Sequence, residues 1–322
     1  MDVIEELQKP LRPRKGRGGR ASSPRRPQKL SKPALDRMLR GAPEVMVKIT
    51  SSARSMQRIR SQVTYLSRRG KVPIEDESGN VYLGPDATTD MLYPWAMSRH
   101  VIPETESKGT RRESHHVVWS MPANTDRAAV TQAARRTAEK LFAGYQYVMA
   151  THDDQPQPHV HMVIRTVALD GRKMNPRKAD LQHWRETFAD ELQALGIEAN
   201  ATLRVHRGRT ERAQSQDVQH IDERLKGRGA QSKVSKAQEQ AAQDEIEGKA
   251  SGWKGRAVLD EQRKDLLHTY AEQIRELLGG TMTDRKLGKN LAQFATNLPP
   301  VQTRHERLVR EKREKQVVRG RE

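Results

Sequence analysis

The chain has 322 residues, of which only 34% are hydrophobic and 31% are charged, so a single compact core over its whole length is excluded. The absence of cysteine excludes a disulfide framework and a cysteine-ligated metal. No apolar run approaches the roughly 20 residues of a membrane span, and the N-terminus lacks an apolar secretory segment. We therefore expect a cytoplasmic protein without membrane insertion. The net charge of +18 favours nucleic acid as a partner, although a basic protein without a specific partner has the same composition.

Composition divides the chain into three parts. Residues 1–42 are dominated by Arg, Lys, Pro, Gly and Ser, which predicts a disordered basic arm that adds salt-dependent affinity for phosphates. Residues 43–205 hold most of the periodic apolar pattern and predict the folded domain. Residues 206–322 predict a charged, helical extension with a basic tail, in which 256–278 is the clearest helix.

The periodicity of the middle part predicts strands and helices in a mixed order. In chain order we expect a strand from Val45, a helix over 53–69, a short hairpin around Gly79, a strand at 115–121, a helix from about 126 to 142, strands at 145–152 and 159–166, and a helix from Asp180 to Leu195. Two strands separated by a short turn favour antiparallel pairing. The sequence therefore predicts an α/β (α+β) domain with a largely antiparallel central sheet and flanking helices.

Three of the 11 histidines lie in the stretch T-H-D-D-Q-P-Q-P-H-V-H, as His152, His159 and His161. Strand alternation places His159 and His161 on one face, with Val163 and Arg165, and the apolar residues Val160, Met162 and Ile164 on the other. A hairpin would bring His152 beside the pair. Three neutral imidazoles can hold a divalent ion and leave coordination positions open for a substrate oxygen. The alternative is a group of ordinary surface histidines at a loop.

Tyr65 belongs to the helix predicted over 53–69 but lies roughly 140° from the centre of its apolar stripe, at about 100° per residue. Arg54, Arg58 and Arg69 fall on the same side. Arginines stabilise a phosphate and favour the phenolate form of tyrosine, which is the nucleophile. The alternative is an amphipathic tyrosine on a solvated basic face.

These motifs resemble a known family. The run H-D-D-Q-P-Q-P-H-V-H fits the relaxase motif H-x-D-x-x-x-P-H-x-H, and Q-V-T-Y-L-S-R-R-G-K fits the segment around the nucleophilic tyrosine of P-class (MOB-P) relaxases. That class of conjugative relaxases and mobilisation nucleases includes the T-DNA border endonuclease and belongs to the HUH tyrosine endonuclease superfamily. H-H-V-V-W-S-M-P resembles the strand between these motifs. The resemblance covers roughly residues 43–205. Pro156 departs from the border endonuclease, which has a further acidic residue there.

The resemblance implies an enzyme that nicks one strand of DNA at an origin of transfer and remains bound to the 5′ end as a phosphotyrosine. Tyr65 would match the nucleophile, and Asp154 the acidic residue that supports the site. His152, His159 and His161 would match the metal ligands, with Mg²⁺ or Mn²⁺ as the working ion and Zn²⁺ or Ni²⁺ as alternatives. His116 matches a recurrent histidine of unassigned role. The candidate DNA contacts are Arg54, Arg58, Arg68, Arg69 and Arg165.

The implied partners are single-stranded DNA at the origin, accessory relaxosome proteins and a type IV coupling protein, with transfer of the strand into a recipient cell. Three other classes compete. A rolling-circle replication initiator shares the metal and tyrosine, but its tyrosine usually follows the histidine motif. A non-catalytic DNA-binding accessory protein would not need Tyr65 and all three histidines. An unrelated metallohydrolase would need neither Tyr65 nor the charge of +18.

Overall fold

The computed structural model describes residues 27–106, 109, 111–211, 214–249 and 256–319. The chain forms two compact units. One, here called the sheet unit, is Lys32–Ala201, and the other, the helical unit, combines Met1–Ser31 with Thr202–Glu322. All candidate site residues belong to the sheet unit.

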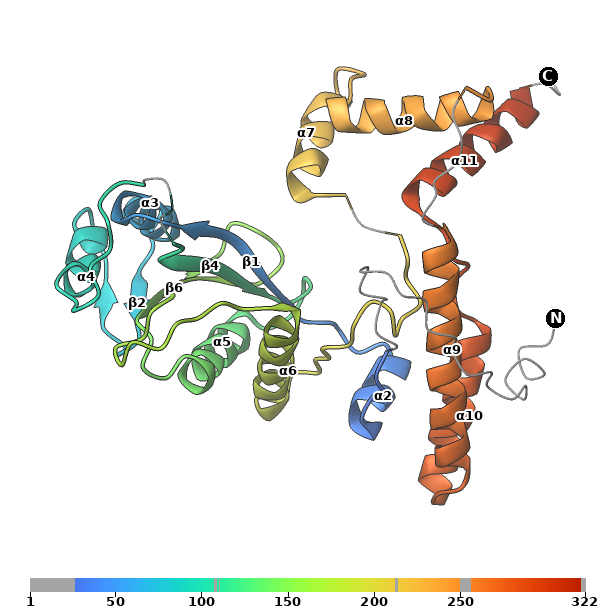
Figure 1. The fold of residues 1–322 in the computed structure, drawn as a ribbon, viewed down its shortest axis with the longest axis horizontal. Helices are drawn as coiled ribbons and strands as arrows, with labels where there is room; N and C mark the ends of the chain where they lie inside the picture. Colours follow the sequence, from blue (N-terminus) through green and yellow to red (C-terminus); the bar gives the residue numbers. More distant parts are fainter. Residues whose placement is uncertain (1–26, 107–108, 110, 212–213, 250–255, 320–322) are drawn as a thin grey trace. The chain divides into compact units, whose positions relative to one another are not determined.

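The sheet unit contains a six-stranded sheet with the order β1-β4-β6-β5-β2-β3, in which every pair is antiparallel (Figure 1). The predicted antiparallel sheet is confirmed. The strands are β1 (Met46–Ala53), β2 (Ile74–Asp76), β3 (Val81–Tyr82), β4 (Ser114–Ser120), β5 (Tyr147–His152) and β6 (His159–Arg165). The central position of β6 places the two histidines of that strand deep in the unit.

Helices cover both faces of this sheet (Figure 1). On one face lie α5 (Arg127–Leu141) and α6 (Lys178–Ala194), whose apolar stripes pack around Trp119, Met162 and Phe188. On the other lie α3 (Met56–Leu66) and α4 (Ala87–Ala96), which pack around Ile59, Val148 and Val163. Every residue of β4 and β6 is buried as a result.

This second core covers the histidine face of β6, and the sequence did not predict it. The face does lie opposite Val160, Met162 and Ile164, but α3 and its apolar stripe cover part of it. The stripe of α3 was predicted as Met56, Ile59, Val63 and Leu66, and all four are buried. A strand pattern shows which residues share a face but not what covers that face.

Two helices of the sheet unit were missed. The segment predicted as arm up to residue 42 contains α2 (Lys32–Leu39), which is held by the buried side chains of Leu35 and Met38. The predicted arm over residues 1–26 lies outside the described residues. The second missed helix is α4, which contains Pro94 yet buries Met91, Leu92 and Trp95. Burial of large apolar side chains outweighs the hydrogen bond that proline removes.

Three helix starts also differ in detail from the prediction. Helix α3 begins at Met56, because the buried Ser55 caps it by accepting a hydrogen bond from the Arg58 amide. The N-cap of α5 is Asp126, whose side chain accepts from the Ala128 amide, so the helix begins at Arg127. In α6, Asp180 lies at the third helical position and accepts from the Arg177 amide.

The helical unit is built from helices, as the sequence predicted. They are α7 (Gln216–Lys226), α8 (Lys233–Ile246), α9 (Arg256–Leu278), α10 (Met282–Thr296) and α11 (Arg304–Arg319). Helices α9 and α10 pack together through buried residues that include Leu266, Tyr270 and Leu291. Within the described part of the chain, no helix is both long enough and apolar enough to cross a bilayer.

Candidate metal and tyrosine site

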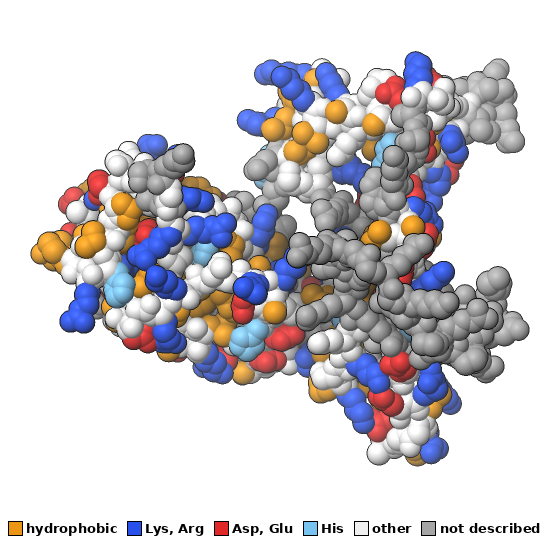
Figure 2. Space-filling view, in the orientation of Figure 1, with side chains coloured by type: hydrophobic (Ala, Val, Ile, Leu, Met, Phe, Trp, Pro, Cys, Tyr) orange, Lys and Arg blue, Asp and Glu red, His pale blue; other side chains and the backbone are white. Residues whose placement is uncertain are grey.

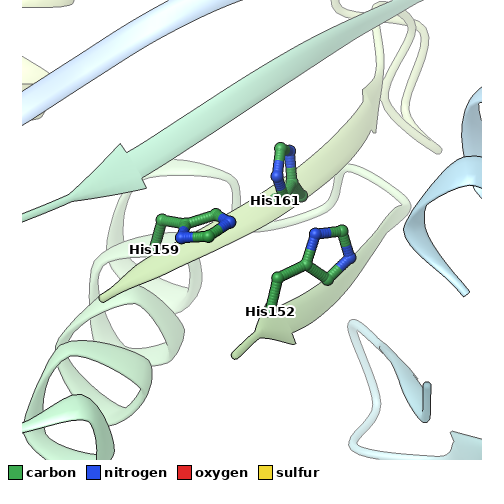
Figure 3. Close-up of side chains that lie close together, drawn as sticks. All are labelled: His152, His159 and His161. Atoms are coloured by element: carbon green, nitrogen blue, oxygen red, sulfur yellow. The ribbon is translucent and has the colours of Figure 1, made fainter. Parts of the chain in front are cut away.

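Three histidines lie together where the hairpin of β5 and β6 turns (Figure 3). His152 ends β5 and pairs in register with His159, the first residue of β6, while His161 stands opposite Ala150. All three are buried, and each offers a ring nitrogen within 4.8 Å of those of the other two. The predicted grouping of His152, His159 and His161 is therefore present in the fold.

A hydrogen bond anchors one nitrogen of each ring. His152 Nε2 donates to the carbonyl of Leu66 at 2.8 Å, and His159 Nδ1 donates to the carbonyl of Gln157 at 2.9 Å. His161 Nδ1 lies 3.0 Å from His116 Nε2. The nitrogens outside these three hydrogen bonds are His152 Nδ1, His159 Nε2 and His161 Nε2, and of these His152 Nδ1 lies 3.1 Å from Arg68 Nη2. A ligating histidine whose second nitrogen is hydrogen-bonded is the arrangement that metal sites in proteins use.

Burial favours the neutral form of His116, His152 and His161, and neutral imidazole is the form that binds metal. It lowers the pKa of His161 to about 2 and that of His116 to about 4, and nearby His152 acts in the same direction on both. The pKa of His152 is also lowered, chiefly by burial. The donor set therefore fits a divalent ion, and its imidazole nitrogens suit Zn²⁺ or Ni²⁺.

His116 lies behind His161, whereas Asp154 lies beside the nitrogen of His159 that remains for a metal ion. Asp154 Oδ1 is 3.6 Å from His159 Nε2, and Asp154 also forms an ion pair with Arg68. If His161 binds an ion through Nε2, its Nδ1 carries the hydrogen and His116 Nε2 must accept it. A bulge in β1 near Ile49 and Ser51 accompanies this arrangement, and Thr50 Oγ1 donates to the His116 carbonyl at 3.2 Å.

Tyr65 stands at the edge of the histidine group, on the last turn of α3. Its ring centroid lies 5.6 Å from that of His161, 6.0 Å from that of His152 and 6.1 Å from that of His116, in edge-on arrangements. The side chain is 49% exposed, so its hydroxyl is accessible to a substrate. The off-stripe position of Tyr65 in the sequence is confirmed, and the fold brings it to the predicted metal ligands.

An open groove of about 830 Å³ runs beside Tyr65 along the outer face of α3. Its lining residues are Gln57, Arg60, Ser61, Thr64, Tyr65, Arg68, Arg69 and Lys71. Four of these are cations. Arg54 and Arg58 are exposed on the same helix region but do not line the groove.

The prediction that Arg165 contacts DNA is not supported by its position. Arg165 is only 2% exposed. Its guanidinium donates to Ser98 Oγ at 2.7 Å, to Gln146 Oε1 at 2.6 Å and to the His100 carbonyl at 2.9 Å. The strand pattern placed Arg165 on the histidine face correctly, but residues 98–100 cover that end of β6. We assign Arg165 to the packing of this segment.

Three residues at the candidate site were not predicted from the sequence. Arg127 donates to the His152 carbonyl at 2.7 Å and to the Gln155 carbonyl at 2.9 Å, and thereby fixes the turn that carries the histidines. Arg60 and Lys71 line the groove. Arg127 contacts residues that lie 25 and 28 positions further along the chain, so no local pattern could have revealed these contacts.

Comparison with known proteins agrees with this geometry. Residues 78–196 match the model of the family "Relaxase: MobA/VirD2-like, nuclease domain". Residues 78–196 are therefore similar to a relaxase nuclease domain of the MobA/VirD2-like type. This match contains all three histidines and Asp154, and Tyr65 lies before it.

The chain is related to the T-DNA border endonucleases VirD2. It is 28% identical to that of Rhizobium radiobacter over 208 residues, which are 56% of this chain and 49% of the relative. It is 27% identical to that of Agrobacterium fabrum (strain C58) over 186 residues, 52% of this chain and 42% of the relative. The chain thus spans about half the length of the curated relatives it matches. A solved structure of the conjugative relaxase TrwC in complex with OriT DNA matches with a TM-score of 0.32 and 15% identity, over 69% of this chain and 97% of that one.

Proposed function

We propose that the chain is a strand-specific DNA relaxase that nicks one strand at an origin of transfer and becomes joined to its 5′ end through Tyr65. The observation that carries this proposal is the meeting of an exposed tyrosine with a buried three-histidine group, at ring-centroid distances of 5.6–6.1 Å. The relaxase family match and the likeness to border endonucleases support the same activity.

The proposed reaction is a transesterification at a phosphodiester. The Tyr65 oxygen attacks the phosphorus in line, a bond forms between them, and the bond from phosphorus to the 3′ oxygen breaks. The phenol loses a proton, and the departing 3′ oxygen gains one. Because one phosphodiester replaces another, the step is reversible and the same residues can rejoin the strand.

The histidines and the arginines have separate parts in this proposal. His152, His159 and His161 would hold a divalent ion, with Mg²⁺ or Mn²⁺ as the proposed working ion. A bound ion supplies positive charge beside a non-bridging oxygen of the scissile phosphate, where negative charge grows in the transition state. His116 would orient the ring of His161, since a partner behind a ligand fixes its geometry. Asp154 would support the site as the acid beside His159 Nε2.

The basic groove is the proposed path of the single strand. It lies open beside Tyr65, and four cations line it. Arg60 is paired with Glu104, and on the same helix Arg58 is paired with Glu106, all at exposed positions. Exposed ion pairs contribute little stability, so phosphates can take over these arginines at small cost. Lys and Arg side chains also lie on the visible faces of both units (Figure 2), which supports further salt-dependent contacts.

We also propose that the protein acts in the cytoplasm. Accessory relaxosome proteins, a type IV coupling protein and transfer of the bound strand to a recipient stay predictions of the resemblance.

A covalent adduct is the direct test. Wild type, Tyr65→Phe and Tyr93→Phe would be incubated with labelled single strands tiled across the DNA flanking the gene, with Mn²⁺ or Mg²⁺, and run on a denaturing protein gel. Tyr93 is a matched control because it is 62% exposed in α4 of the same unit. We expect a labelled adduct with wild type and Tyr93→Phe, none with Tyr65→Phe, and none after chelation. Cleavage without an adduct would show hydrolysis by water and would refute the tyrosine mechanism.

A further inference from the structure

The side chain of Arg68 extends from the end of α3 into the centre of the site. Its Nη2 lies 3.1 Å from His152 Nδ1, and it forms an ion pair with Asp154. Its guanidinium carbon also lies 4.7 Å from the centroid of the Tyr65 ring. One cation thus contacts the proposed nucleophile, a proposed metal ligand and the acid beside another ligand.

The contact with His152 involves the lone pair that a metal ion would need. The Leu66 carbonyl can only accept a hydrogen bond, so His152 Nε2 carries the ring hydrogen and Nδ1 carries the lone pair. Arg68 donates to that same Nδ1. A guanidinium and a metal ion cannot share one lone pair. Asp154 is subject to the same conflict, because its carboxylate is paired with Arg68 and lies 3.6 Å from His159 Nε2.

The backbone fixes the base of Arg68, whereas its side chain has an exit. Arg68 and Arg69 have φ of 50° and 59°, a left-handed conformation that is uncommon outside glycine. The amides of both residues donate to carbonyls of α3, those of Tyr65 and Thr64, at 3.2 and 2.9 Å. The side chain of Arg68 is 31% exposed and lines the groove beside Tyr65. A rotation about its side-chain bonds would move the guanidinium from His152 into the groove.

We propose that Arg68 competes with the divalent ion for His152 and Asp154, and that the ion displaces its guanidinium into the groove, where it binds a phosphate of the DNA strand. This proposal rests on the proposed function and adds to it a coupling between metal binding and DNA binding. The ion frees Arg68 for phosphate, and phosphate draws Arg68 away from the metal ligands. By thermodynamic linkage, each ligand then tightens binding of the other by the same factor. The planar guanidinium suits this exchange, since it matches both a carboxylate and a phosphate as a bidentate donor.

Measuring metal affinity without DNA distinguishes competition between Arg68 and the ion from a purely structural role of Arg68. Mn²⁺ binding would be measured by titration calorimetry on the full chain for wild type, Arg68→Ala, Arg68→Lys and Arg69→Ala. Arg69 is the matched control because it has the same charge, a similar backbone conformation and a place in the same groove. We expect Arg68→Ala to bind Mn²⁺ roughly fivefold or more tightly than wild type. Arg68→Lys should lie between them, and Arg69→Ala should equal wild type.

The same variants would be tested for adduct formation. We expect Arg68→Ala to form adduct more slowly than wild type at saturating Mn²⁺, although it binds the ion more tightly. Unchanged or weaker Mn²⁺ binding by Arg68→Ala and Arg68→Lys, with melting curves like that of wild type, would overturn the competition. Failure of the proposed function is distinguishable, because it would appear as the absence of any wild-type adduct whatever the Mn²⁺ affinities.

Discussion

Gly70 is the position at which the structure predicts the largest effect of a single methyl group near the site. Its φ is +79°, and a Cβ built there would lie 1.9 Å from the carbonyl oxygen of Gly84 and 2.4 Å from its carbonyl carbon. Both are backbone atoms, so no side chain can move aside. The Gly84 amide also donates to the Gly70 carbonyl at 3.0 Å, so the two segments are joined at this point.

The expected cost of Gly70→Ala has three parts. The left-handed conformation costs an L-residue about 1–2 kcal/mol. Relief of the overlap requires a backbone shift of about 1 Å, which we equate with overpacking at about 1–3 kcal/mol. Weakening of the hydrogen bond from Gly84 adds about 1 kcal/mol. We therefore expect the free energy of unfolding to fall by roughly 3–6 kcal/mol.

Gly79→Ala is the matched control in the same unit. Gly79 has φ of +81° but would place its Cβ more than 4 Å from any atom, so it shares only the conformational part of the cost, about 1–2 kcal/mol. Urea unfolding followed by tryptophan fluorescence would measure both variants, because Trp95, Trp119 and Trp184 are buried in the sheet unit. Equal losses for Gly70→Ala and Gly79→Ala would refute the argument from the Gly84 contact.

Two further predictions concern histidines. His116→Ala should weaken Mn²⁺ binding by roughly 10–100-fold, because His161 loses the hydrogen-bond partner of its Nδ1. His116→Gln should retain more affinity, because its amide oxygen can accept the same hydrogen bond. Equal calorimetric affinities for wild type and His116→Ala would contradict this role of His116. His206 is 3% exposed, and burial lowers its pKa to about 4, so between about pH 6.5 and 4 the unfolded chain binds a proton that the folded chain does not. The free energy of unfolding should therefore decrease by up to about 3 kcal/mol as the pH is lowered through this window. His206→Gln should remove this decrease, measured as the difference in urea unfolding between pH 7.5 and pH 5. His220→Gln, at an exposed position, should leave it unchanged, and a wild-type-like dependence in His206→Gln would refute the prediction.

Periodicity predicted most of the sheet unit because its elements carry strong local patterns. The alternation in 159–166 and the stripe of Met56, Ile59, Val63 and Leu66 correspond to β6 and α3. Helix α4 was missed because Pro94 is a local signal against a helix, while the burial that stabilises α4 comes from distant residues. Helix α2 was missed for a related reason: two buried side chains, Leu35 and Met38, hold a segment whose composition is that of the basic arm.

The sequence by itself indicated which residues lie together in the candidate site. The spacing of His152, His159 and His161 and the off-stripe place of Tyr65 are local features, and the periods of a strand and a helix convert them directly into shared faces.

Only the tertiary structure decided how those residues are oriented and which arginines are free. The anchoring of His152 by Leu66 and the contact of Arg68 with Asp154 join residues 86 positions apart, and Arg165 is buried by a segment 65–67 positions away. Such contacts depend on strand order and on which helix covers which face. Those are set by the packing of the whole unit, which no local sequence pattern contains.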